Sequence, residues 1–198
     1  MSRGSRVLKG CVAALVLSST GLSSVQLASA QEREVSVAVG DILRDGLEAQ
    51  ARGDGEALLK AALALARSGA RPDTGDADLV RVWIRDAQTM GAKLPKTFYA
   101  SRGLLLGPAY KSGKIAANGK FTTRQSFAGG QMADILVVPA PGAALSLRVI
   151  DDEGDEVCAV TASSENLGCR WVPVYTAPSS ITVVNTSRKP AKFYLVMN

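Results

Sequence analysis

The sequence predicts an α+β protein in which an N-terminal α-helical hairpin is docked on a C-terminal antiparallel β-sandwich. Two patterns indicate this architecture. Between residues 31 and 100, apolar residues recur at a spacing close to 3.6, which is typical of amphipathic helices. Between residues 119 and 198, short runs alternate apolar and polar residues, as at Leu145, Leu147 and Val149, and turn residues separate the runs. A period of two indicates half-buried strands, here of a jelly-roll-like sandwich.

Residues 1–30 have the three parts of a secretory signal peptide. Basic residues open the chain, an apolar stretch runs from Cys11 to Leu17, and Ala28-Ser29-Ala30 fits the A-x-A cleavage pattern. The apolar stretch is shorter than the roughly 20 residues that a membrane-spanning helix needs. We therefore expect cleavage after Ala30 and a periplasmic or secreted mature protein that does not span a membrane.

Helix signals divide residues 31–100 into three segments. Asp54 is a typical N-cap, and Gly69 and Gly91 are typical helix stops. Gly46 weakens the first helical pattern, whereas Trp83 belongs to an apolar stripe that would pack within a hairpin or against the sheet. The expected helices cover residues 40–52, 54–69 and 77–90.

Turn residues concentrate between residues 101 and 118, where we place the connection between the helical region and the sandwich. Within this connection, the three leucines at 104–106 are too apolar for a free linker and are expected to pack between the two parts. The sandwich domain then occupies residues 119–198. Its seven expected strands cover residues 121–127, 131–138, 144–150, 156–161, 169–175, 180–185 and 192–197.

Two cysteines, Cys158 and Cys169, remain in the expected mature chain. In an exported protein, such a pair predicts a disulfide. A zinc site is the alternative, but two thiols in a chain without histidine cannot complete the usual shell of four ligands. The disulfide would stabilise the fold by roughly 3 kcal/mol on the chain-entropy estimate.

The middle of the chain carries only positive charges. Between Asp86 and Asp134 there are several lysines and arginines and no acidic residue. A positive surface there would attract an anionic ligand. The alternative is a solvated connection followed by an edge strand that charge protects. Aromatic residues in this stretch stand beside apolar ones rather than forming a stacking face, so nucleic acid is not an expected partner. The candidate patch consists of Lys111, Lys114, Lys120 and Arg124.

The chain contains no histidine, which excludes Ser-His-Asp and Cys-His catalysis and most transition-metal sites. A Ser-Lys pair is the remaining nucleophilic arrangement, with Ser101 or Ser112 beside Lys111 or Lys114. No sequence feature indicates that these lysines are desolvated. We therefore expect a protein that is not an enzyme and needs no cofactor.

Acidic residues surround Gly154 between residues 151 and 156. Carboxylates in such a cluster could bind calcium, with Asp151, Asp152 and Asp155 as the candidate ligands. The segment lacks the glutamate that closes a complete calcium loop, and Asp and Gly are also the residues that a polar hairpin turn requires. A turn without metal is the favoured interpretation.

The order of features in residues 119–198 resembles a known domain family. Gly130-Gln131 precedes a strand, a leucine-rich strand runs into Asp151 and Gly154, and a strand with Tyr194-Leu195 closes the chain. This order is similar to that of the bacterial pre-peptidase C-terminal domain family, whose members are small β-sandwiches in secreted proteins. The resemblance implies a sandwich without catalytic residues that accompanies secreted peptidases or binds collagen or carbohydrate. The chain departs from the family in its cysteine pair and in having no peptidase before the domain.

These observations predict an exported, non-enzymatic binding or envelope-associated protein. Its expected partners are an envelope protein, a secreted peptidase, a glycan or an anionic polymer. One alternative is an accessory or inhibitor module for a secreted peptidase, and another is a Ser-Lys hydrolase or carbohydrate-active protein.

Overall fold

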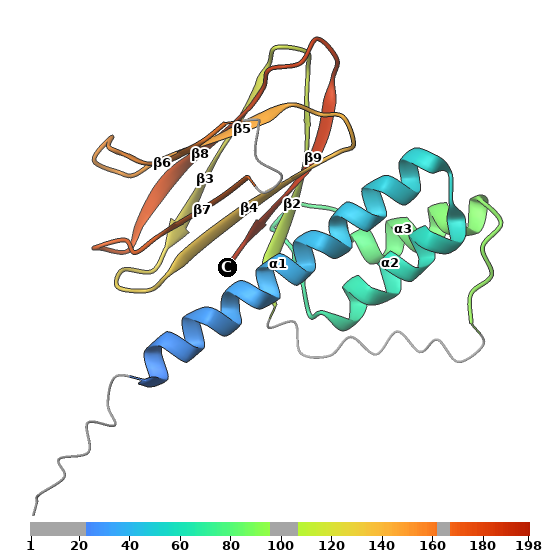
Figure 1. The fold of residues 1–198 in the computed structure, drawn as a ribbon, viewed down its shortest axis with the longest axis horizontal. Helices are drawn as coiled ribbons and strands as arrows, with labels where there is room; N and C mark the ends of the chain where they lie inside the picture. Colours follow the sequence, from blue (N-terminus) through green and yellow to red (C-terminus); the bar gives the residue numbers. More distant parts are fainter. Residues whose placement is uncertain (1–22, 96–106, 162–166) are drawn as a thin grey trace, which may run out of the picture.

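The computed structural model describes residues 23–95, 107–161 and 167–198. Two β-sheets face each other, and a layer of helices packs on the outer side of one sheet (Figure 1). The α+β fold that the sequence predicts is confirmed. The described helices are α1 (Ser23–Arg52), α2 (Gly55–Arg67) and α3 (Leu79–Thr89). The described strands are β1 (Arg71–Pro72), β2 (Ala109–Ile115), β3 (Lys120–Phe127), β4 (Ala133–Pro139), β5 (Leu145–Ile150), β6 (Glu156–Val160), β7 (Leu167–Trp171), β8 (Ala177–Asn185) and β9 (Ala191–Met197).

Helices α2 and α3 lie where their capping residues predict them. The Asp54 carboxylate accepts a hydrogen bond from the backbone N–H of Ala57 at 3.0 Å, which caps α2. Asp78 caps α3 in the same way. Both helices are followed by a glycine with a positive φ, Gly69 at 73° and Gly91 at 92°. None of the described helices combines the length and the apolar character needed to span a bilayer.

Helix α1 is longer than the sequence pattern predicts, because it begins at Ser23 rather than near residue 40. Its two internal glycines lie on the packing face. A Cβ at Gly40 would overlap Leu136 of β4, and a Cβ at Gly46 would overlap the ring of Trp83. Gly46 is therefore required for close packing, and the helix continues through it despite the low intrinsic helix propensity of glycine.

The nine described strands form two sheets. The first, sheet A, has the order β1-β2-β9-β4-β7, and the second, sheet B, has the order β3-β8-β5-β6. Every pairing is antiparallel except that of β1 with β2. The chain changes sheet repeatedly, as it does between β3 and β4 and between β4 and β5.

Strand β2 lies inside the segment that the sequence predicts as a connection. It is paired with β9 along its whole length, from Ala109 opposite Met197 to Ile115 opposite Ala191. Its sequence, AYKSGKI, has few β-branched residues and a central glycine, which is why propensity does not reveal it. Gly113 is accepted because the ring of Phe193 on β9 occupies the space of its missing side chain. The three leucines at 104–106 lie outside the described residues.

Two strand ends also differ from the prediction. Strand β7 ends at Trp171 rather than Tyr175, and Pro173 follows it. Strand β8 begins at Ala177 and includes Pro178, which is paired only with β3 because β5 ends opposite Ser180.

Sheet A separates two apolar cores. The core between the sheets contains inward residues of both, whereas the core between sheet A and the helices contains Trp83 together with outward residues of β4 and β9. Because β4 and β9 are buried on both faces, they read as continuous apolar runs, ILVV and FYLVM, rather than as alternating patterns.

The predicted disulfide between Cys158 and Cys169 is confirmed. It joins β6, the edge strand of sheet B, to β7, the edge strand of sheet A. The disulfide therefore connects the two sheets along one side of the sandwich.

Candidate functional site

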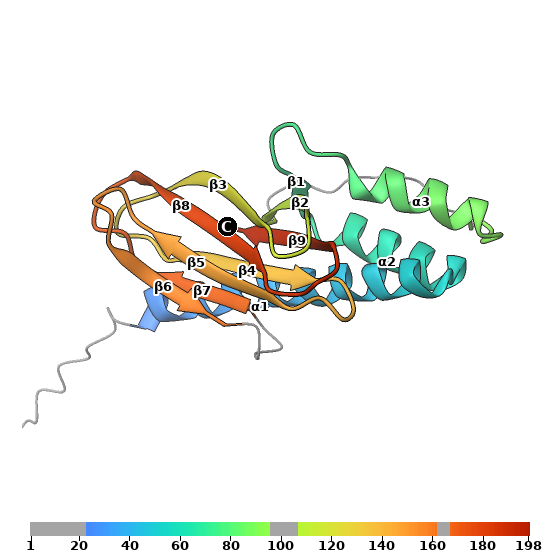
Figure 2. The same ribbon diagram turned by 90° about the horizontal axis from the view of Figure 1, so that it is seen from above.

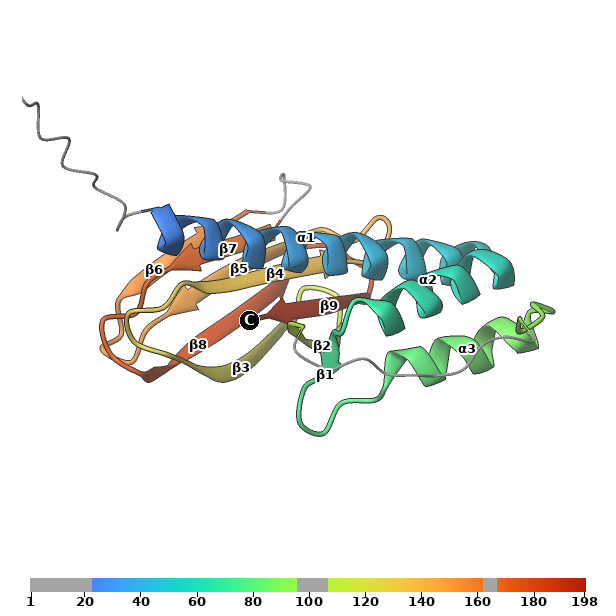
Figure 3. The ribbon, with the colours of Figure 1, turned by 90° about the horizontal axis from the view of Figure 1, so that it is seen from below.

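The outer side of sheet B is the broad face that the helices leave uncovered. Helix α1 lies along sheet A, against β4 and β9, and α2 and α3 extend past one end of the sandwich (Figures 2 and 3). On β3, Phe121 and Phe127 contact the inter-sheet core, so the residues that alternate with them face outward. The same alternation places Ile181 of β8 and Leu147 of β5 inside and their neighbours outside.

We call this outward surface the open face. It combines three cations with five hydroxyl side chains and one carboxylate. Its polar residues are Lys120, Thr122, Arg124 and Ser126 of β3, Ser180 and Thr182 of β8, Ser146 and Arg148 of β5, and Glu156 of β6. The register also places four apolar residues on this face: Pro178 and Val184 of β8, Ile150 of β5 and Ala159 of β6.

The register of the strands brings these side chains side by side. Thr122 lies opposite Thr182, and their hydroxyl oxygens are 3.2 Å apart. Thr182 in turn lies opposite Arg148, whose Nε contacts a carboxylate oxygen of Glu156 at 2.7 Å. Lys120 and Arg124 form no ion pair with a described residue. The face therefore carries a net positive charge beside a row of hydroxyls.

The four residues of the predicted anionic-ligand patch do not lie together. Lys120 and Arg124 belong to β3 of sheet B, and both lie on the open face. Lys114 and Lys111 are on β2 of sheet A, and Lys114 faces the helices. Sequence reasoning missed Arg148 and the hydroxyl side chains, although their alternation with core residues was a signal for them.

Lys111 contacts two carboxylates rather than a free surface. Its Nζ lies 2.7 Å from Asp73 Oδ2 and 3.4 Å from Asp76 Oδ2. Ser112 donates both its backbone N–H and its hydroxyl to Asp76 Oδ1, each at 2.9 Å. The hydrogen bond to Asp73 raises the pKa of Lys111 and lowers that of Asp73.

This geometry opposes a Ser-Lys hydrolase built on Lys111 and Ser112. The lysine of such a pair must lose its proton to activate the serine, which requires a lowered pKa. The pKa of Lys111 is raised, and the Ser112 hydroxyl is directed to Asp76. Ser101, the other candidate nucleophile, lies outside the described residues.

Replacing Asp73 by asparagine is expected to lower the free energy of unfolding by on the order of 1 kcal/mol near neutral pH. Because the pKa of Asp73 is depressed in the folded protein, its stabilising effect is present above the unfolded value of 3.8 and is lost as the pH falls through the folded value. Denaturant unfolding of both proteins across acid pH measures this difference. A stability difference that persists unchanged at the most acidic pH would contradict the assignment.

The acidic residues around Gly154 form a hydrogen-bonded turn. Asp151 Oδ1 accepts backbone hydrogen bonds from Glu153 at 3.1 Å and Asp155 at 2.8 Å, and the Asp151 N–H donates to the Asp155 carbonyl. Gly154 has a φ of 97°, which favours glycine. This geometry fits the turn interpretation, whereas calcium binding by Asp151, Asp152 and Asp155 stays an untested alternative.

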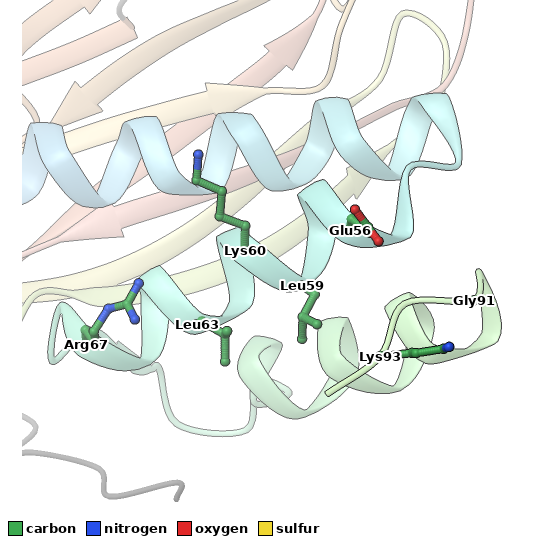
Figure 4. A pocket seen from close by; sticks show the side chains of 7 residues that line it. All are labelled: Glu56, Leu59, Lys60, Leu63, Arg67, Gly91 and Lys93. Atoms are coloured by element: carbon green, nitrogen blue, oxygen red, sulfur yellow. The ribbon is translucent and has the colours of Figure 1, made fainter. Parts of the chain in front are cut away.

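A groove of about 410 Å³ lies between α2 and the residues that follow α3 (Figure 4). Leu59 and Leu63 line it together with the cations Lys60, Arg67 and Lys93. Residues 96–106, which lead from this region to Gly107, lie outside the described residues, so we assign no site to this groove.

No protein-family model and no curated protein matches this chain. Among solved structures, the pre-peptidase C-terminal domain of a collagenase from Bacillus anthracis is 12% identical, with a TM-score of 0.40, and the match covers 46% of this chain and 89% of that chain. A mitogen derived from Yersinia pseudotuberculosis is 13% identical, with a TM-score of 0.39 and coverage of 46% and 85%. A periplasmic inhibitor of g-type lysozyme from Aeromonas hydrophila is 10% identical, with a TM-score of 0.35 and coverage of 46% and 86%. These are similarities of fold, and no functional conclusion rests on them.

Proposed function

We propose that this is an exported, non-catalytic binding protein whose open face holds an anionic polysaccharide. The observation that supports it is the composition of that face, where Lys120, Arg124 and Arg148 stand among five hydroxyl side chains with Glu156 as the one acid. Lysine and arginine bind carboxylate or sulfate groups, and the hydroxyls of serine and threonine both donate to and accept from sugar hydroxyls.

The spacing of the cations favours a polymer over a small anion. Lys120 and Arg124 are four residues apart on β3, which places their Cα atoms about 13 Å apart along the strand. A single carboxylate cannot contact both, whereas a chain of charged sugars can. Because the cations are exposed, their attraction is screened by salt, so binding should weaken as ionic strength rises.

The open face contains no aromatic side chain among its described residues. Phe121 and Phe127 of β3 are directed to the core. Stacking of a sugar ring on an aromatic platform is therefore not the means of recognition in this proposal, and charge with hydrogen bonding takes its place.

The double variant Lys120→Glu/Arg124→Glu is expected to bind polygalacturonate at least about tenfold more weakly than the wild type, because it replaces two of the three cations of the open face by acids. A tenfold loss corresponds to about 1.4 kcal/mol of binding free energy. Calorimetric titration at low salt measures this loss, with neutral dextran as the uncharged comparison. The matched control is Lys60→Glu/Arg67→Glu, which makes the same charge change on α2 at exposed positions far from sheet B. Loss of binding in the α2 variant and not in the β3 variant would overturn the proposal.

A second candidate function, an accessory module for a secreted peptidase, is favoured by an exposed apolar tip. We use this name for Val172, Val174 and Tyr175 between β7 and β8, which are 52%, 79% and 75% exposed. Two hydrogen bonds hold the loop against the turn after β3, from Gly129 N–H to Thr176 Oγ1 at 2.9 Å and from Gly130 N–H to the Pro173 carbonyl at 2.8 Å. An exposed aromatic side chain such as that of Tyr175 is a typical anchor for a protein partner.

A further inference from the structure

A cleft of about 400 Å³ lies between α3 and the neighbouring strands β2 and β9 of sheet A. The start of α3 is held there by a hydrogen bond from the Leu79 N–H to the Tyr110 hydroxyl of β2, at 3.1 Å. Val82 and Trp83 line the cleft from the helix, and Lys114, Lys192 and Tyr194 line it from the strands. A volume of this size is typical of sites for small molecules.

Two lysines lie directly opposite each other at this cleft. Lys114 of β2 is in register with Lys192 of β9, both are exposed, and neither has an ion-pair partner among the described residues. Like charges that face each other across two strands are destabilising. Asp86, the acid that lines the same cleft, already accepts two hydrogen bonds from Arg85, at 3.1 and 3.2 Å. The cleft therefore has an excess of positive charge.

Two buried side chains that carry hydrogen-bond donors, Trp83 and Tyr194, also line the cleft. The indole Nε1 of Trp83 is fully buried and makes no hydrogen bond with a described residue. The Tyr194 side chain is buried, and this burial raises its pKa to about 12; the neighbouring Trp83 side chain opposes the rise, and the charge of Asp86 adds a smaller contribution to it. The hydroxyl therefore stays protonated at neutral pH. A buried donor without an acceptor destabilises the protein, so an acceptor oxygen that reaches it would be stabilised.

We propose that this cleft binds a small organic carboxylate with a flat apolar body. The carboxylate would lie between the ammonium groups of Lys114 and Lys192 and offset their repulsion. Its oxygens would accept hydrogen bonds from the donors of the cleft. The apolar body would cover Val82 and the ring of Tyr194. This site shares no residue with the open face, so the inference goes beyond the proposed polysaccharide binding.

The test is an NMR titration with sodium benzoate, observing the indole Nε1–H signal of Trp83, with neutral benzamide as the isosteric comparison. The Trp171→Phe variant assigns the two tryptophan signals. Benzoate is expected to shift the Trp83 signal saturably and to bind more tightly than benzamide. The Lys114→Gln/Lys192→Gln variant should weaken benzoate binding by about fivefold, since the two lysines are exposed charges worth roughly 1 kcal/mol together.

The matched control is Lys120→Gln/Arg124→Gln, which removes the same number of positive charges from the open face and should bind benzoate as the wild type does. This control also separates the two proposals, because it weakens polysaccharide binding and leaves the cleft intact. Absence of a saturable shift, equal binding of benzamide, or unchanged binding in a folded Lys114→Gln/Lys192→Gln variant would overturn the inference.

Discussion

Replacing Trp83 by alanine is expected to lower the free energy of unfolding by about 3–5 kcal/mol, which is the usual cost of truncating a large buried aromatic residue. Trp83 is fully buried at the centre of the core between the helices and sheet A. Its ring lies against Gly46 of α1 and meets the ring of Tyr194 edge to face, with centroids 5.9 Å apart. One side chain thus connects α3, α1 and β9.

Denaturant unfolding followed by circular dichroism measures this loss, and the fluorescence of Trp171 reports on the sandwich separately. The control is Val37→Ala, at a half-exposed position of α1, where surface substitutions usually change stability by less than about 0.5 kcal/mol. Gly46→Leu should be destabilising as well, because its side chain would occupy the space of the Trp83 ring. If the Trp83→Ala variant had the same free energy of unfolding as the Val37→Ala variant, this role of Trp83 would be refuted.

Removing the disulfide by Cys158→Ala/Cys169→Ala is expected to lower the free energy of unfolding by about 3 kcal/mol. The two cysteines are 11 residues apart, and the bond restricts the unfolded chain while joining the edge strands of the two sheets. Without it, the unfolded chain has more conformational freedom.

Chemical unfolding of the oxidised protein, the reduced protein and the alanine variant tests this prediction. The variant and the reduced wild type should unfold at similar denaturant concentrations, and both should unfold at lower concentrations than the oxidised wild type. Their free energy of unfolding should also depend more steeply on denaturant if the unfolded state expands. Identical midpoints for oxidised and reduced protein would show that the disulfide contributes nothing to stability.

Local signals in the sequence located most of the fold. The ends of α2 and α3 follow from Asp54, Gly69 and Gly91, because caps depend on the residue itself and its nearest neighbours. The strands with clear alternation, such as β5, were located to within a residue. Strand β2 was missed because its apolar contacts come from β9, about 80 residues away in the chain.

The candidate site could be predicted only in part, for the same reason. Charge alone indicated Lys120 and Arg124 as ligand-binding residues, but it indicated Lys111 equally, although Lys111 is paired with carboxylates in the structure. Its partners Asp73 and Asp76 precede it by more than 30 residues, and only the β1–β2 pairing brings them together. Gly46 was misjudged in the same way, since the side chain that requires it, Trp83, belongs to another helix.

The continuous apolar runs of β4 and β9 distinguish the two sheets already in the sequence. They indicate that sheet A is covered on both faces, whereas the alternating β3 and β5 indicate that sheet B has one face open to solvent. That distinction alone assigns the solvent-facing sheet surface to sheet B.

Amide chemical-shift mapping with a short oligogalacturonate tests the proposed function most directly. Binding through the open face predicts saturable, salt-sensitive shifts confined to β3, β8 and β5, around Lys120, Arg124 and Arg148. Shifts confined to the exposed apolar tip or to the helices, or no shift at low salt, would contradict binding through the open face.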